Sequence, residues 1–390
     1  MEADFLIVGG GIGGGVLAEL LGRAGKKVVL LEKALAPRNW VRPEILWPAT
    51  VEILFSLLPR RTWEENALLC LGGIEVRDGS GTIRSLSPEV FQKIQVERWA
   101  ADANETRETL LRLGSFELRR GVEVIGVLKE EDRVIGVRTR EVASCREAEI
   151  LAPWTIGDDG AYSLVRQACG LELKTRLFPI DFLCFGFSCP PAFEKTTTKI
   201  WVNLGKSDGI LALLAVPLPQ GRGAGVILVR PETFEREEEQ KEVWRRFCVL
   251  DPSLRQVVGE RTFPSDFARV RRHWGHAARY GIKGAILMGD ASHPVSPAGG
   301  QGANMSVADA HALAQVSLDN SSSLLEEYER RRRKANARSL RFTRLAARAL
   351  DLPTWGLPSS FFLSVAHWVA QQPSLVRPLV RYVSTAFQEK

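Results

Sequence analysis

The sequence predicts an α/β protein in which a Rossmann-like dinucleotide-binding domain is combined with a mainly antiparallel β-sheet domain and a helical C-terminal region. Three observations support this prediction. An apolar run at 4–8 leads through a glycine cluster and a helical stretch at 16–23 to a second apolar run at 27–32, which is the pattern of a βαβ unit. Short β-like runs separated by Pro and Gly turns fill residues 182–230. An arginine-rich helix is expected at 324–350.

The composition is that of a globular protein with a substantial core. Of 390 residues, 45% are hydrophobic and 25% are charged. The six cysteines form no CxxC pair and there are five histidines, so we expect no metal site and no disulfide scaffold, in a reduced, cytoplasmic setting. The net charge of +6 is not interleaved with stacking aromatic residues, which argues against nucleic acid and favours anionic ligands or a membrane surface.

The elements between these landmarks follow from hydrophobic periodicity and turn signals. A loop is expected at 37–48, where Pro, Arg and Trp cluster. After it the sequence predicts, in chain order, a helix at 51–58, a hairpin at 73–86, a helix at 106–113, strands at 122–128, 134–140 and 152–156, and a helix at 163–169. Further along it predicts strands at 182–187, 198–204, 210–216 and 225–229, a charged helix at 234–247, a strand at 284–290 and a helix at 302–316.

These elements suggest a division of the chain into domains. The dinucleotide-binding domain is expected to be discontinuous, at 1–72, 100–174 and 276–330. A substrate-binding sheet is expected at 73–99 and 175–275, and a helical C-terminal region at 331–390.

The first glycine cluster carries a dinucleotide-binding pattern. Gly9, Gly11 and Gly14 match G-x-G-x-x-G between a strand and a helix, where they permit a tight turn, a close approach to a pyrophosphate and helix–strand packing. The N–H groups and dipole of the helix N-terminus favour phosphate. Glu32 ends the next strand about 20 residues on, as a ribose partner should, with Lys33 beside it. This favours FAD or NAD; the alternative is a glycine-rich packing turn.

A second motif, at 156–166, closes a strand and opens a helix. Gly160 allows the turn, and Asp159 can accept backbone N–H groups within it. Ser163 and Arg166 lie at the helix start, where an anion could bind. A purely structural turn is the alternative.

A third motif, at 289–304, is the strongest signal in the chain. Gly289 and Asp290 close a strand, and the Asp290 carboxylate can hydrogen-bond a polyol. The loop that includes Pro297 ends at a helix N-terminus, where backbone N–H groups from 299 to 303 would face a negative charge. A reduced flavin needs such donors, and glycines let it approach the backbone.

Together, the three motifs resemble those of the single-component FAD-dependent aromatic hydroxylases, the para-hydroxybenzoate hydroxylase family. The resemblance runs over roughly residues 1–350 and makes the dinucleotide-binding domain an FAD-binding one. The cofactor contacts that it implies are Gly9, Gly11, Gly14, Glu32, Lys33, Arg42, Arg107, Asp159, Gly160, Arg166, Gly289, Asp290, Pro297, Gly299, Gly300, Gln301, Gly302, Ala303 and Asn304. Of these, the resemblance ascribes Asp159 and Arg166 to both FAD and NAD(P)H.

The resemblance also implies the chemistry. NAD(P)H reduces the flavin and leaves, O2 adds to give a flavin C4a-hydroperoxide, and an electron-rich substrate carbon takes the distal oxygen. Pro297, whose carbonyl would face the reacting flavin, and His293 are the catalytic candidates; for His293 a structural role in the flavin loop is the alternative. A small, largely apolar aromatic or polycyclic substrate is expected against Phe185, Trp201 and Leu213, which could equally be ordinary sheet core.

Rival interpretations remain at this point. An FAD-dependent reductase of the geranylgeranyl reductase type shares the glycine loop, and a non-catalytic FAD-fold scaffold predicts eroded motifs that are intact here. The basic face of the helix at 324–350 is either solvated or a peripheral contact with anionic lipid. Either a monomer or a homodimer is compatible with the sequence.

Overall fold

The computed structural model describes residues 2–37, 41–78, 82–177, 180–190, 196–202, 210–230, 245, 248–249, 251–255, 268–270, 273–295, 297, 300–319, 323–350, 364, 367–372 and 374–378. The charged helix expected at 234–247 lies almost entirely outside the described residues, as does most of the tail beyond 350. No helix in the described ranges is long and apolar enough to span a bilayer.

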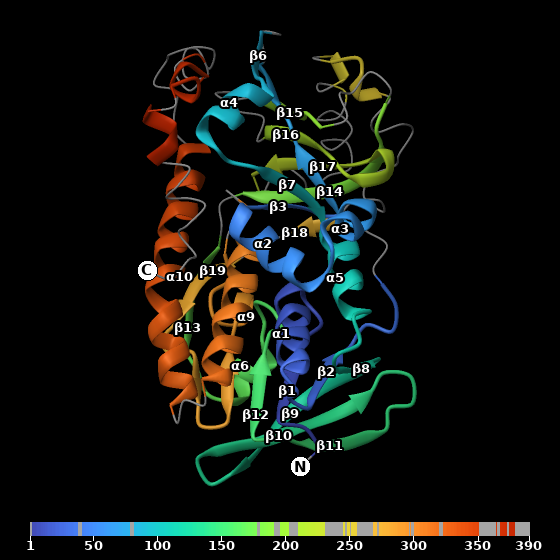
Figure 1. Ribbon diagram of the computed structural model, residues 1–390, viewed down its shortest axis with the longest axis vertical. Helices are drawn as coiled ribbons and strands as arrows, with labels where there is room; N and C mark the ends of the chain where they lie inside the picture. Colours follow the sequence, from blue (N-terminus) through green and yellow to red (C-terminus); the bar gives the residue numbers. More distant parts are fainter. Residues whose placement is uncertain are drawn as a thin grey trace.

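A six-stranded, mainly parallel sheet forms the lower half of the molecule (Figure 1). Its strands, in spatial order, are β20 (Gly281–Ile282), β21 (Ala285–Leu287), β12 (Trp154–Gly157), β1 (Phe5–Val8), β2 (Val28–Glu32) and β8 (Glu117–Arg120). Only β20 runs antiparallel to its neighbour. The predicted βαβ unit is therefore present, with α1 (Ile12–Arg23) joining β1 to β2.

Both faces of this sheet are covered, as a parallel sheet requires. Alternation along β1 sends Phe5 and Ile7 into a core shared with α1, and Leu6 and Val8 into a core on the opposite face. The second core is closed by a three-stranded antiparallel sheet of β9 (Val122–Glu130), β10 (Arg133–Glu141) and β11 (Glu147–Leu151). The short helix α6 (Leu164–Ala168) follows β12.

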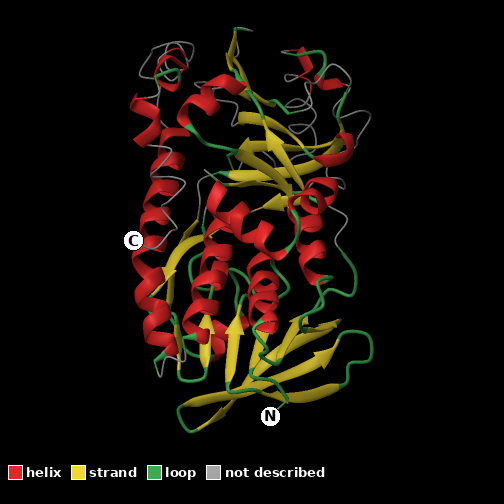
Figure 2. Ribbon diagram, in the orientation of Figure 1, coloured by secondary structure: helices red, strands yellow, loops and turns green. Residues whose placement is uncertain are grey.

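The upper half holds a seven-stranded, mainly antiparallel sheet, and helices lie between the two sheets (Figure 2). Its strands, in spatial order, are β18 (Ala268–Val270), β14 (Asp181–Ser188), β17 (Arg222–Val229), β16 (Ile210–Pro217), β15 (Thr198–Val202), β5 (Ile74–Asp78) and β6 (Ile83–Leu86). The short helix η1 (Pro219–Gly221) joins β16 to β17. The hairpin predicted at 73–86 is β5–β6, and the predicted antiparallel region is confirmed.

One predicted loop is wrong in part. Residues Pro43–Leu46 form the strand β3, which pairs with β7 (Arg98–Asp102) and so joins a three-stranded sheet completed by β4 (Leu68–Leu71). The proline misled the sequence interpretation, but β3 is an edge strand and Pro43 is its first residue, where no ladder N–H is needed. The helices around this sheet are α2 (Pro48–Leu57), α3 (Arg60–Asn66), α4 (Pro88–Ile94) and α5 (Ala103–Leu111).

Two helices complete the described chain. After the short helix η3 (Gly289–Ala291), α9 (Gly302–Leu318) packs on α1, and α10 (Leu324–Leu350) runs along one side of the molecule (Figure 1). A two-stranded ribbon of β13 (Leu173–Leu177) and β19 (His273–Ala277) lies beside α10. The basic positions Arg330 and Lys334 of α10 are exposed, whereas Arg332 is buried. The proposed division into domains at 72, 99, 174 and 275 remains a proposal.

Candidate functional site

The three sequence motifs meet at one edge of the parallel sheet. The strands β21, β12 and β1 are neighbours in the sheet and run in the same direction, so the motif that follows each strand emerges at the same edge. Ligands of open α/β sheets bind outside the carboxyl ends of the strands. This arrangement brings segments about 150 residues apart in the sequence into one site.

The glycine loop after β1 is as tight as its pattern predicts. Gly9 has φ +108°, and a Cβ there would lie 2.4 Å from the carbonyl oxygen of Asp158. A Cβ on Gly14 would lie 2.3 Å from the Gly9 carbonyl oxygen. Side chains are therefore excluded at both positions, and α1 begins directly against the loop.

The N-terminus of α1 is open to an anion. Gly11 is the N-cap residue and supplies no side chain to cap the first N–H groups. Asp158 Oδ2 accepts the Gly14 N–H at 2.7 Å, so a carboxylate oxygen already satisfies one of these donors. The helix dipole and the earlier N–H groups favour a phosphate at this end.

Glu32 shapes the loop from the end of β2. Its Oε2 accepts the Gly10 N–H at 3.1 Å and its Oε1 accepts the Ala34 N–H at 2.7 Å. The side chain is buried, with 7% exposure, and each carboxylate oxygen retains a lone pair for a further donor. Lys33, the next residue, is exposed.

Asp158 lies where the three motifs meet, yet sequence reasoning did not single it out. Its Oδ1 accepts from the Ser306 hydroxyl at 3.5 Å, and a Cβ on Gly289 would lie 2.6 Å from the same oxygen. Burial raises the pKa of this carboxyl well above its ordinary value, and the carboxylates of Asp290 and Asp159 add to the effect. The Gly14 N–H opposes it. The doubled acid at 158–159 was the available signal.

The second motif is joined to the third by Arg166. Asp159 Oδ2 accepts the Val165 N–H at 3.1 Å, and burial raises the pKa of its carboxyl. The Arg166 guanidinium donates to the carbonyls of Ala291 (2.8 Å) and Ala161 (2.9 Å). Arg166 therefore cross-links two motifs in addition to any contact with a nucleotide. Gly160 has φ +84° and borders open space.

Arg42 faces the third motif from the segment before β3. It forms an ion pair with Glu44 at 2.6 Å. Burial acts to lower its pKa, but Glu44 and Asp290 outweigh this and raise it. Asp290 therefore lies within electrostatic reach of Arg42, as expected of two residues on one cofactor.

The loop that leads into α9 is held mostly by its own backbone and by Asn304. The Pro297 carbonyl accepts the Gly300 N–H at 2.9 Å, which closes a turn. Asn304 Oδ1 accepts from Trp47 N (3.0 Å) and Thr50 Oγ1 (2.7 Å), and its Nδ2 donates to the carbonyls of Ile45 and Gly300. The four hydrogen bonds saturate the amide, so Asn304 positions the loop from within the protein.

The other predicted residues of this loop are accounted for as follows. Gln301 and Ala303 are buried at the start of α9, and Gly302 is its first residue. Gly299 lies outside the described residues.

Comparison with known proteins decides the family. The FAD binding domain family matches residues 2–343. The chain belongs to this family. Rifampicin monooxygenase of Streptomyces venezuelae is 25% identical over 319 residues, which cover 80% of this chain and 63% of that protein. The chain thus spans less than two thirds of that relative's length. The 6-methylpretetramide 4-monooxygenase of Streptomyces rimosus is 25% identical over 376 residues, covering 90% and 84%.

Solved structures of the same shape are also known. The p-nitrophenol 4-monooxygenase from Pseudomonas putida has a TM-score of 0.76 and 22% identity, with 100% of each chain covered. A Pseudomonas aeruginosa protein crystallised with 2-aminobenzoylacetate has a TM-score of 0.75 and 22% identity, covering 90% of this chain and 97% of that one. The fold class is confirmed, and so is the resemblance to FAD-dependent hydroxylases that the three motifs carried.

The residues of the site fit the cofactor of the family. In addition to the open helix N-terminus, several buried polar atoms have no hydrogen-bond partner in the part of the chain that the structure describes, among them Arg107 Nε on α5 and Asp159 Oδ1. Among the described residues, Arg107 forms an ion pair only with its neighbour Glu108, at 3.1 Å. Leaving buried polar groups unpaired is costly, so donors and acceptors of a bound FAD are the expected partners.

His293 is buried against an acidic residue of α9. Its side chain is 1% exposed, and its Nε2 lies 2.5 Å from Asp309 Oδ2. The structural alternative weighed above therefore describes its position better than a catalytic base does. His276 is partly buried beside Tyr280, with His276 Nε2 2.6 Å from the Tyr280 hydroxyl.

The three residues expected to contact substrate are buried together in the seven-stranded sheet. Phe185, Trp201 and Leu213 share a closed cluster with Cys248 and Leu254, and Trp201 Nε1 donates to Asp251 at 3.1 Å. They occupy the face of the sheet away from Arg42. Apolar character was the only signal in the sequence, and it is the same for both faces of a strand, so it could not choose between them.

Proposed function

We propose that the chain is an FAD-dependent monooxygenase that uses NAD(P)H and O2 to hydroxylate or epoxidise a small, largely apolar aromatic or polycyclic compound. The observation that carries the proposal is the convergence of three cofactor motifs at the ends of β1, β12 and β21, with glycines where a side chain would block the approach. Two relatives are named as monooxygenases of rifampicin and of 6-methylpretetramide, and these names support the same reaction class and a place in secondary metabolism.

A bound FAD would supply the redox chemistry, taking electrons from NAD(P)H and activating O2. This chain would bind the FAD pyrophosphate at the α1 N-terminus and hold the adenosine ribose with Glu32. Asp290 and Arg42 would lie beside the rest of the cofactor. No protein nucleophile is needed. The route of oxygen transfer implied by the family resemblance is part of this proposal.

The face of the seven-stranded sheet that we assign to the substrate is opposite to the one predicted from sequence. Alternation along β14 directs Cys184 and Gly186 toward the cofactor segment, since a Cβ on Gly186 would lie 2.6 Å from Val41 Cγ2. Cys184 is likewise within electrostatic reach of Arg42. The neighbouring side chains on this face are apolar: Phe182, Leu214, Val226 and Leu228. An apolar substrate fits this lining.

Trp47 supplies a candidate polar contact. Its indole packs on Val295 and Met305, next to the loop of Pro297. Its Nε1 is buried and has no hydrogen-bond partner among the described residues. A carbonyl or hydroxyl oxygen on the substrate would satisfy this donor.

The first experiment is an absorption spectrum of the purified protein, followed by NAD(P)H oxidation and O2 uptake with a panel of phenols, quinolones and indoles. We expect a flavin spectrum and oxidation that one aromatic class accelerates, with a hydroxylated or epoxidised product by mass spectrometry. Bound flavin that reduces isolated double bonds without O2 uptake would favour the reductase alternative. A protein that cannot be loaded with FAD would overturn the proposal and leave the scaffold alternative.

Trp47→Phe and Trp201→Phe make a matched pair for locating the substrate. Trp47→Phe removes the indole N–H donor and should raise KM about 10-fold, since the loss of one hydrogen bond to the substrate has about this effect. Trp201→Phe loses a bond to Asp251 inside a closed cluster and should lower stability while leaving KM within about twofold.

A further inference from the structure

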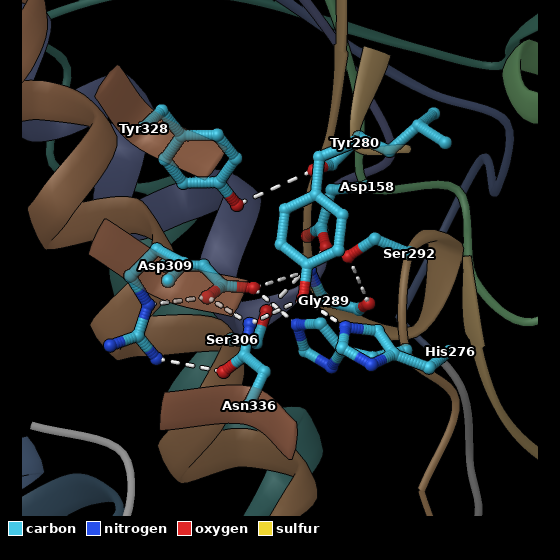
Figure 3. Close-up of polar contacts among 12 residues, drawn as sticks. Asp158, His276, Tyr280, Gly289, Ser292, Ser306, Asp309, Tyr328 and Asn336 are labelled. Atoms are coloured by element: carbon cyan, nitrogen blue, oxygen red, sulfur yellow. Dashed lines mark hydrogen bonds and ion pairs between the residues drawn. The ribbon is translucent and has the colours of Figure 1, made fainter. Parts of the chain in front are cut away.

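Asp309 is a buried carboxylate surrounded by polar side chains (Figure 3). It lies on α9 with 0% exposure and accepts four hydrogen bonds. Oδ2 accepts from Gly289 N at 3.0 Å and lies 2.5 Å from His293 Nε2. Oδ1 accepts from Arg332 Nε at 2.7 Å and Asn336 Nδ2 at 3.0 Å. Each oxygen thus serves a different segment of the chain.

The oxygen Oδ2 holds both ends of a turn. Gly289 opens the turn that carries Asp290, and His293 closes it, with its own N–H donating to the Gly289 carbonyl at 2.9 Å. The Asp290 side chain is therefore displayed from a turn whose first and last residues bind one carboxylate oxygen. This accounts for a histidine at 293 better than base catalysis does.

The oxygen Oδ1 connects the turn to α10. The Arg332 side chain is 1% exposed and also donates from Nη2 to Asn336 Oδ1 at 2.9 Å. Burial alone would raise the pKa of Asp309, but His293 and Arg332 outweigh it and hold that pKa well below its ordinary value. Asp309 is consequently charged at neutral and mildly acidic pH.

A second layer holds Asn336 in place. Its Nδ2 also lies 3.2 Å from the Tyr280 hydroxyl, which in turn lies 2.6 Å from His276 Nε2. Burial lowers the pKa of His276 to about 4, so His276 is neutral and accepts the tyrosine proton. Figure 3 shows Asn336, Tyr280 and His276 arranged around Gly289 and Asp309.

We propose that Asp309 and Arg332 are positioning residues for the flavin half of the cofactor. Arg332 orients Asp309, and Asp309 fixes the turn from 289 to 293 so that Asp290 meets the ribityl chain. This rests on the proposed function only in that FAD must bind. The adenosine half is held separately, by the loop of Gly9 and by Glu32, so the two halves should respond differently to loss of Asp309.

The test compares FAD with ADP, which has the adenosine and phosphates but no flavin or ribityl chain. Dissociation constants of both are measured for Asp309→Asn and for a matched control, Asp319→Asn. Asp319 also lies at α9 and pairs with an α10 arginine, Arg331 at 3.5 Å, but its side chain is 65% exposed. A charge-assisted network should contribute about 10- to 100-fold to FAD affinity.

We expect Asp309→Asn to weaken FAD binding by that factor and to leave ADP affinity within twofold of wild type. Asp319→Asn should change neither affinity. Equal weakening of FAD and ADP, or no weakening of either, would overturn the positioning role. If wild-type protein binds ADP but not FAD, the proposed function itself has failed.

A milder pair of variants covers the case in which Asp309→Asn does not fold. His293→Gln keeps an N–H donor for Asp309 Oδ2, and His293→Leu removes it. The positioning role requires FAD affinity near that of the wild type in His293→Gln and at least 10-fold weaker in His293→Leu. Equal FAD affinities in the two variants would refute it.

Discussion

Asp158 offers the sharpest test of the electrostatics at the site. Its carboxyl accepts the Gly14 N–H at 2.7 Å and lies near Asp159 and Asp290, and burial raises its pKa well above the ordinary value. The folded protein therefore retains this proton at a pH where the unfolded chain has released it. Folding stability must fall as pH rises from the unfolded pKa to the folded one.

The magnitude follows from proton linkage. One proton held by the folded state and not by the unfolded state costs about 1.4 kcal/mol for each pH unit above about pH 3.9. Partial contact of Asp158 with solvent makes this slope an upper bound. Asp158→Asn removes the titration and keeps an amide oxygen for the Gly14 N–H. The variant should therefore be more stable than wild type at neutral pH, by an amount that shrinks toward pH 4.

Urea denaturation at pH 4.5, 5.5, 6.5 and 7.5 gives the comparison. Asp132→Asn is the control, because Asp132 is exposed and its pKa is lowered by Lys283, which reverses the sign. A stability difference between Asp158→Asn and wild type that does not grow with pH would refute the reasoning. In the same variant FAD affinity should lose pH dependence, since cofactor phosphates repel an ionised Asp158 but not an amide.

Three further predictions follow from the fold and the site. Gly14→Ala places a Cβ 2.3 Å from the Gly9 carbonyl oxygen and should abolish FAD binding in equilibrium dialysis, whereas Gly25→Ala meets no atom within 4 Å and should cost only about 1 kcal/mol at its φ of +80°. Retained FAD in Gly14→Ala would contradict the close approach. His276, with a pKa lowered from 6.5 to about 4, contributes stability that is present above pH 6.5 and lost as pH falls to 4, discounted for partial exposure to about 1–2 kcal/mol. His276→Gln should reduce this loss of stability between pH 6.5 and 4, as measured by denaturation at each pH, and an unchanged loss would contradict the prediction. Phe185→Leu should cost about 1–2 kcal/mol in a urea melt with KM unchanged, and a KM shift above fivefold would return Phe185 to the substrate site.

Much of the fold could be read from local patterns. The parallel sheet follows from two apolar runs around a glycine loop, and the antiparallel sheet from short strands between Pro and Gly turns. These features depend on neighbours in the sequence, which one sequence displays. The strand Pro43–Leu46 could not be recognised in this way, because it is defined by pairing with Arg98–Asp102, more than 50 residues away.

The same distinction between local and long-range signals applies to the residues of the site. The glycines and Glu32 were recognisable because each serves the cofactor through its own backbone or a fixed spacing. Phe185, Trp201 and Leu213 lie on the face opposite to the one that we propose for the substrate, and the sequence could not choose between the two, because a period of two gives the faces of a strand but not which one meets the cofactor. That choice is made by Val41 packing on Gly186, a contact between distant segments.

The long basic helix shows why charge counted along the sequence can mislead. Arg330–Arg333 is a continuous run of four arginines that reads as a solvated or lipid-facing surface. A helix turns 100° per residue, so four consecutive side chains point in four directions. Arg330 pairs at the surface with Glu327, whereas Arg332 points inward to Asp309. A lone aspartate in the alanine-rich helix α9 was the available signal, since an acid in an apolar helix needs a buried cation. The cation it finds lies 23 residues on, in the helix beside it.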